Sequence, residues 1–82
     1  MIELARTALA RGQGDAARNA LENHTHEFPH GELVEEREGL LVQMFVSLKD
    51  YETARKLGAG FHRRFPTSIF GAMVDQALRT IP

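Results

Sequence analysis

Cysteine and tryptophan are absent from this chain of 82 residues, and aromatic side chains make up only 7% of it. Without cysteine there is no disulfide framework, no thiolate metal ligand and no thiol nucleophile, and the compartment cannot be inferred from redox chemistry. No apolar run exceeds three residues, so no segment is expected to insert into a membrane. The hydrophobic core that a chain of 82 residues can form gives only marginal stability without a disulfide or a metal. We therefore expect one small domain, residues 1–82, that is a fragment of a longer protein.

Neither sign of charge dominates, since ten lysines and arginines stand against eleven aspartates and glutamates. This balance argues against a general binder of nucleic acid or of anionic membranes. A local basic run remains at His62-Arg63-Arg64, after Arg55 and Lys56. We predict that these side chains spread around a helix and form no phosphate-binding stripe. No nucleic-acid partner is expected.

The chain contains an internal repeat with an offset of 37 residues. This offset places Phe28-Pro29 over Phe65-Pro66 and Ala17-Arg18 over Ala54-Arg55. The identities fall where helices would end and at small packing positions, which is where a helical repeat needs them. We predict repeat-like units over residues 1–30 and 31–67, followed by a C-terminal helix over residues 68–80.

Apolar residues recur with the helical period of about 3.6 residues, and no segment alternates like a strand. The fold is therefore predicted to be all-α, with helices over residues 2–11, 15–27, 32–48, 51–65 and 68–80. Gly12-Gln13-Gly14 is expected to separate the first two helices, and each Phe-Pro pair to end a helix. Asp50 is expected to cap the fourth helix, and Thr67-Ser68 to supply hydroxyl caps for the fifth.

Two of the predicted helices are apolar on more than one side. In the third helix, Val42 and Val46 lie off the stripe that contains Met44 and Leu48, so this helix is predicted to be central and packed on both sides. In the last helix, the residues that wrap more than one face are Ile69, Phe70, Met73, Val74, Ala77, Leu78 and Ile81. We expect part of this surface to bind a partner, to form a homodimer or to meet a continuation of the chain.

Residues 40–68, LLVQMFVSLKDYETARKLGAGFHRRFPTS, resemble a tetratricopeptide repeat. The resemblance rests on Leu41 and Phe45 in the first helix, Lys49-Asp50-Tyr51 at the turn, and Ala54 and Pro66 at the family's spacing. Residues 4–29 look like a degenerate copy. The 37-residue period is similar to the longer repeats of bacterial outer-membrane assembly lipoproteins and other cell-envelope tetratricopeptide proteins. The resemblance implies antiparallel helix pairs stacked as a short solenoid of about five helices.

The same resemblance implies a protein-binding scaffold in which the first helix of each pair lines a concave groove. In this chain the groove maps to Glu36, Gly39, Gln43, Val46 and Ser47. We expect Gly39 to open space, Gln43 and Glu36 to hydrogen-bond a peptide backbone, and Val46 to make an apolar contact. An equal alternative is that these residues pack against the first or the fifth helix. On the C-terminal helix, the expected partner-binding residues are Ile69 and Met73.

Three of the four histidines lie within HTHEFPH, residues 24–30. His26 and His30 have a spacing that suits a metal on one helical face, but Pro29 ends the helix, while His24 and His26 project to different sides. We therefore interpret these residues as solvated histidines at a helix end and expect no bound metal.

Catalytic motifs are equally scarce. The chain has no Gly-rich loop between a strand and a helix and no nucleophile elbow, so we expect neither a catalytic residue nor a cofactor. The sequence favours a non-catalytic interaction or scaffolding module with a protein or peptide partner. The alternative is a structural, self-associating helical domain of a larger bacterial envelope or regulatory protein. The resemblance implies a periplasmic or cell-envelope location, with the cytoplasm as the alternative.

Overall fold

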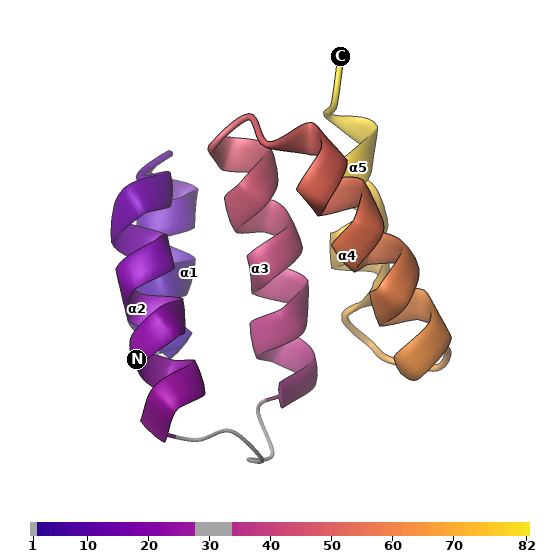
Figure 1. The fold of residues 1–82 in the computed structure, drawn as a ribbon, viewed down its shortest axis with the longest axis horizontal. Helices are drawn as coiled ribbons and strands as arrows, with labels where there is room; N and C mark the ends of the chain where they lie inside the picture. Colours follow the sequence, from indigo (N-terminus) through magenta and orange to yellow (C-terminus); the bar gives the residue numbers. More distant parts are fainter. Residues whose placement is uncertain (1, 28–33) are drawn as a thin grey trace.

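The computed structural model describes residues 2–27 and 34–82, and within those ranges it contains five α-helices and no strand (Figure 1). The helices are α1 (Ile2–Ala10), α2 (Gly14–Glu27), α3 (Val34–Ser47), α4 (Tyr51–Arg64) and α5 (Gly71–Arg79). The prediction of an all-α fold is confirmed. The expected end of the second helix at Phe28-Pro29 and the start of the third at residue 32 lie outside the described residues.

The central helix is α3, which packs against each of the other four helices. The α1–α2 pair lies on one side of α3 and the α4–α5 pair on the other, and the two pairs do not pack directly against each other (Figure 1). The core is divided accordingly. Leu40 and Met44 belong to a cluster with residues of α1 and α2, whereas Val42 belongs to a cluster with residues of α4 and α5. The prediction that the third helix is packed on both sides is therefore confirmed.

The turns α1–α2 and α3–α4 are built by the same backbone hydrogen bonds. In each turn, two N–H groups donate back to carbonyls near the end of the preceding helix: Gly12 to Leu9 (3.0 Å), Gln13 to Ala8 (2.8 Å), Lys49 to Val46 (3.0 Å) and Asp50 to Phe45 (2.9 Å). This pair of bonds defines a Schellman motif, whose first residue after the helix takes a left-handed conformation. The φ angle is +71° at Gly12 and +65° at Lys49, which stand 37 residues apart.

Helix bounds follow the same spacing. The first residues of α2 and α4, Gly14 and Tyr51, are 37 residues apart, and so are the last residues of α1 and α3, Ala10 and Ser47. The offset seen in the sequence thus recurs in where the helices begin and end.

The capping residues agree with expectation at α4 but not at α5. Oδ1 of Asp50 accepts the N–H of Thr53 (3.3 Å), as expected for an N-cap. The expected start of the last helix at residue 68 is wrong, because α5 begins at Gly71. The Ser68 hydroxyl accepts the N–H of Phe70 (3.1 Å) and so stabilises a local turn, while the N-cap residue Phe70 makes no side-chain cap.

Lys49→Gly is expected to raise the free energy of unfolding by about 1 kcal/mol, because glycine adopts a positive φ without the Cβ clash that lysine suffers. Lys56→Gly is the matched control, since Lys56 is an exposed residue within α4. The control should lower the free energy of unfolding by about 1 kcal/mol, the cost of glycine inside a helix. Urea unfolding measures both changes, and two changes of the same sign would contradict the strained turn.

Two glycines of α4 have different surroundings. A Cβ at Gly58 would lie 2.7 Å from Cδ1 of Leu78 on α5, whereas at Gly60 the nearest neighbour would be an Arg63 nitrogen at 3.8 Å. We expect Gly60→Ala to raise the free energy of unfolding by about 1 kcal/mol through helix propensity. Gly58→Ala should give a smaller gain or a loss, because Leu78 must move. Denaturant midpoints test this, and equal gains would contradict the close packing of α5 on α4.

Candidate functional site

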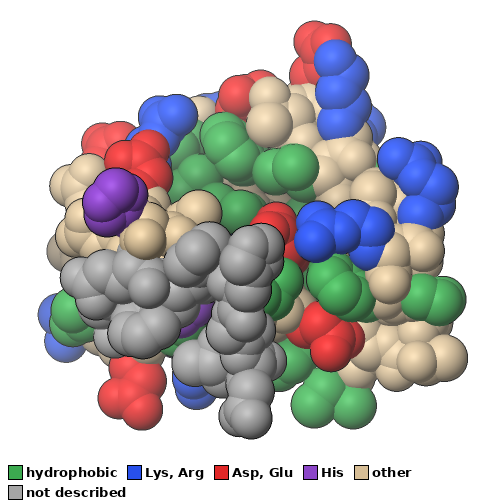
Figure 2. All heavy atoms as spheres, turned by 60° about the horizontal axis from the view of Figure 1, so that its bottom comes forward, with side chains coloured by type: hydrophobic (Ala, Val, Ile, Leu, Met, Phe, Trp, Pro, Cys, Tyr) green, Lys and Arg blue, Asp and Glu red, His purple; other side chains and the backbone are tan. Residues whose placement is uncertain are grey.

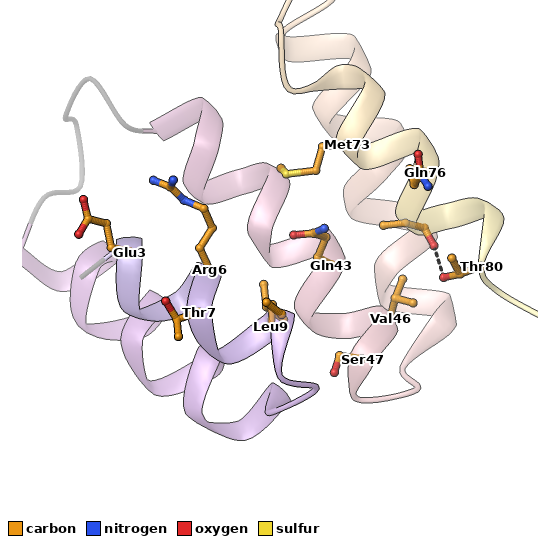
Figure 3. A pocket seen from close by; sticks show the side chains of 12 residues that line it. Glu3, Arg6, Thr7, Leu9, Gln43, Val46, Ser47, Met73, Gln76 and Thr80 are labelled. Atoms are coloured by element: carbon orange, nitrogen blue, oxygen red, sulfur yellow. Dashed lines mark hydrogen bonds between the residues drawn. The ribbon is translucent and has the colours of Figure 1, made fainter.

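A groove of about 870 Å³ opens between α1 and α5, with α3 between them (Figure 3). The α1 wall consists of Glu3, Arg6, Thr7, Leu9 and Ala10. From α3 come Gln43, Val46 and Ser47. The opposite wall consists of Met73, Gln76 and Ala77 of α5 and of Thr80, which follows it. Helices α1, α3 and α5 therefore contribute to one continuous surface.

Four of the seven residues expected to bind a partner line this groove: Gln43, Val46, Ser47 and Met73. Glu36 lies beside it, where its Oε2 is 3.2 Å from Nε of Arg6. The Glu36 side chain is only 13% exposed, whereas that of Arg6 is 55% exposed. Glu36 therefore holds a groove-lining arginine in place, and most of its own carboxylate is covered.

Gly39 does not open space in the groove as expected. It is buried, and a Cβ there would lie 2.6 Å from Cε of Met73. The missing side chain lets Met73 of α5 pack closely on α3, so the space is filled. Ile69, the remaining expected residue, is 87% exposed and is not part of the groove lining.

The α1 wall was missed by the sequence analysis, although the repeat offset contains the signal for it. Moving back 37 residues from Gln43, Val46 and Ser47 gives Arg6, Leu9 and Ala10, which all line the groove. Moving forward from Gln43 by the same offset gives Thr80, which also lines it. Equivalent positions of successive units thus face the same groove.

The side chains that line the groove suit a ligand with a polar backbone and apolar side chains. Side chains of Leu9, Val46 and Met73 supply apolar contacts. Gln43 and Gln76 lie on neighbouring helices, and within residues 2–27 and 34–82 neither amide makes a hydrogen bond (Figure 3). Each amide offers both donors and an acceptor, as a peptide backbone requires. The groove can therefore satisfy backbone polar groups while it buries apolar side chains.

The histidine stretch has one buried and one exposed member. His24 is only 4% exposed, so its interpretation as a solvated residue is wrong, whereas His26 is exposed as expected. A nitrogen of the buried Arg37 guanidinium lies 3.4 Å from Nδ1 of His24. Because arginine can only donate, Nδ1 accepts in this contact. His30 lies outside the described residues, and the described part of the chain contains no group of three potential metal ligands.

The burial of His24 follows from its place in the repeat. Phe61 stands 37 residues later in α4 and is 3% exposed. Both side chains occupy the same position of the second helix in their units, facing the next helix along the chain. In the first unit a polar ring occupies this position, and Arg37 of α3 lies against it.

Most of the basic run on α4 has partners within the chain. Lys56 pairs with Glu52 (3.2 Å), and the Arg64 guanidinium lies over the ring of Phe65, 4.9 Å from its centroid. Nε2 of His62 is 2.8 Å from Oδ1 of Asp75 on α5. On the face drawn in Figure 2, basic and acidic side chains are interspersed, with no continuous patch of either sign.

Comparison with protein-family models, with curated proteins and with solved structures found no match to this chain. None of the described helices combines the length and the apolar character needed to cross a membrane.

His24→Ala is expected to lower the free energy of unfolding by about 1–3 kcal/mol, because it removes a buried ring and the acceptor beside a buried guanidinium. His26→Ala, two residues further along α2, serves as the control. It should change stability by less than about 0.5 kcal/mol, since His26 is exposed. Thermal and urea unfolding measure both, and equal effects would contradict the burial of His24.

Proposed function

We propose that this protein is a non-catalytic, tetratricopeptide-like interaction module that binds an extended peptide segment of a protein partner in the groove between α1, α3 and α5. The observation that supports this most directly is that groove-lining residues recur at the 37-residue offset of the repeat. Arg6 and Gln43 stand at equivalent positions of the two units, Thr80 follows at the same 37-residue offset, and all three line the groove. A surface built from equivalent positions of stacked units is the usual binding surface of repeat proteins.

Two further features support a tetratricopeptide-like solenoid. The turns α1–α2 and α3–α4 have the same flanking helix ends and the same backbone hydrogen bonds at a spacing of 37 residues. Each helix pair contacts the next first helix along the chain, since α3 packs on α1 and α2, and α5 packs on α3 and α4. A cell-envelope location rests on the resemblance in residues 40–68 alone.

Self-association through α5 is the alternative, and it has less support. Val74 and Ala77 are buried by contacts with α3 and α4, and Ile69 is the large apolar residue near α5 that remains mostly exposed. Gln76 and Arg79 stand 37 residues after Gly39 and Val42, which are both buried. Polar side chains thus occupy the positions that a further unit would cover, so an apolar homodimer contact there is not favoured.

The groove proposal is tested by blocking the groove with one side chain. Peptides are selected from a displayed random library on the wild-type protein, and their dissociation constants are measured by fluorescence anisotropy. Ala10→Tyr places a ring in the groove at an exposed position of α1 and should weaken binding at least about tenfold. Ala59→Tyr makes the same change at an exposed position on the outer side of α4 and should leave binding unchanged.

Unfolding curves of the two variants should superimpose, because both alanines are exposed residues within helices. If peptides bind both variants as tightly as the wild-type protein, the groove is not the binding site. If the library yields no binder, peptide recognition by this groove is contradicted.

A further inference from the structure

Charge is distributed unevenly around the groove. The two charged lining residues, Glu3 and Arg6, both belong to α1 (Figure 3). Lining residues from α3, from α5 and from Thr80 are all uncharged. Formal charge among the lining residues is therefore confined to the α1 wall.

The charge at this wall is negative once Glu36 is included. Arg6 is already paired with the Glu36 carboxylate at 3.2 Å. Glu3, one helical turn before Arg6, makes no ion pair within residues 2–27 and 34–82. Within the described residues, these two carboxylates and one guanidinium sum to a net charge of −1, and Glu3 is the exposed carboxylate that makes no ion pair.

We propose that the groove selects peptides with a basic side chain, Lys or Arg, which pairs with Glu3 at the α1 wall; this inference rests on the proposed peptide-binding function. A cation at this wall pairs with Glu3 and leaves the Arg6–Glu36 ion pair intact. A peptide carboxylate on Arg6 would instead compete with Glu36 and be repelled by Glu3. The remainder of the peptide lies along uncharged residues, where Gln43 and Gln76 bind its backbone and Leu9 and Met73 contact its apolar side chains.

Because of the Arg6–Glu36 ion pair, removing the charge of Arg6 and removing the charge of Glu3 should change peptide affinity in opposite directions. Arg6→Gln removes the positive charge and leaves Glu36 as a second carboxylate for the basic side chain. We expect this variant to bind a selected basic peptide about two- to fivefold more tightly, the range of an exposed ion pair. Glu3→Gln should weaken the same peptide by about two- to fivefold. Both effects should shrink in high salt, because exposed charges are screened.

The matched controls carry the same substitutions away from the groove. Arg18→Gln disrupts the exposed Arg18–Glu22 pair of α2, and Glu52→Gln disrupts the exposed Glu52–Lys56 pair of α4. Neither control should change affinity. Each selected peptide is also synthesised with its basic residue replaced by Gln and by Glu, and affinity should fall in the order basic, neutral, acidic.

The outcomes separate this inference from the proposed function. If peptides bind in the groove and Ala10→Tyr blocks them, but Arg6→Gln weakens binding or acidic peptides bind best, then the basic preference is wrong and the groove function stands. If the affinity of groove-bound peptides does not depend on their charge, the basic preference is likewise wrong and the groove function stands. If no peptide binds in the groove, both proposals fail. Sedimentation that shows a dimer dispersed by the selected peptide would make a second copy of this chain the occupant and overturn the basic-peptide assignment.

Discussion

The burial of α3 on two sides is the constraint on which the rest of the structure depends. Leu40 and Met44 are almost completely buried against α1 and α2, and Val42 is buried against α4 and α5. Because the two outer helix pairs do not pack on each other, α3 alone fixes their relative position. The groove lies between α1 and α5, so its width is set by a helix whose own exposed surface is small. The stability of the fold and the shape of the groove therefore both depend on α3.

Much of this architecture could be predicted from the sequence, because small packing residues and helix-ending residues recur at the 37-residue offset. Ala17 and Ala54, which the repeat offset pairs as small packing positions, are both fully buried. The tetratricopeptide resemblance predicted Gln43, Val46 and Ser47, and the apolar surface of the C-terminal helix predicted Met73; all four line the groove. The 37-residue offset also relates the α1 wall to α3. Arg6 and Leu9 were not predicted as groove residues because their helix is short and its sequence matches the repeat only weakly.

The failures of prediction occur where residue type and position in the repeat disagree. The polar ring of His24 and its place near a predicted helix end indicate exposure. At the 37-residue offset, however, His24 corresponds to Phe61, which is buried. What decides the burial of His24 is the contact with Arg37, thirteen residues away, and no local pattern encodes that pairing. Gly39 illustrates the opposite case, since a small residue suggests open space until Met73 of a distant helix is found to fill it.

Core and groove positions differ in how much the residue type varies between positions that are 37 residues apart. Core positions that are 37 residues apart are mostly small or apolar, as Ala5 and Val42 are, because a buried polar group loses water. His24, at the position of Phe61, is polar, and Arg37 lies against it as a partner. Groove positions are free of this constraint, and the equivalent residues Arg6, Gln43 and Thr80 differ in charge, length and hydrogen-bonding capacity. The succession from charged to uncharged across the groove makes its two walls chemically distinct. In the proposed complex, a peptide would meet a different side chain at each of these positions, so recognition would come from the variation at a fixed 37-residue spacing.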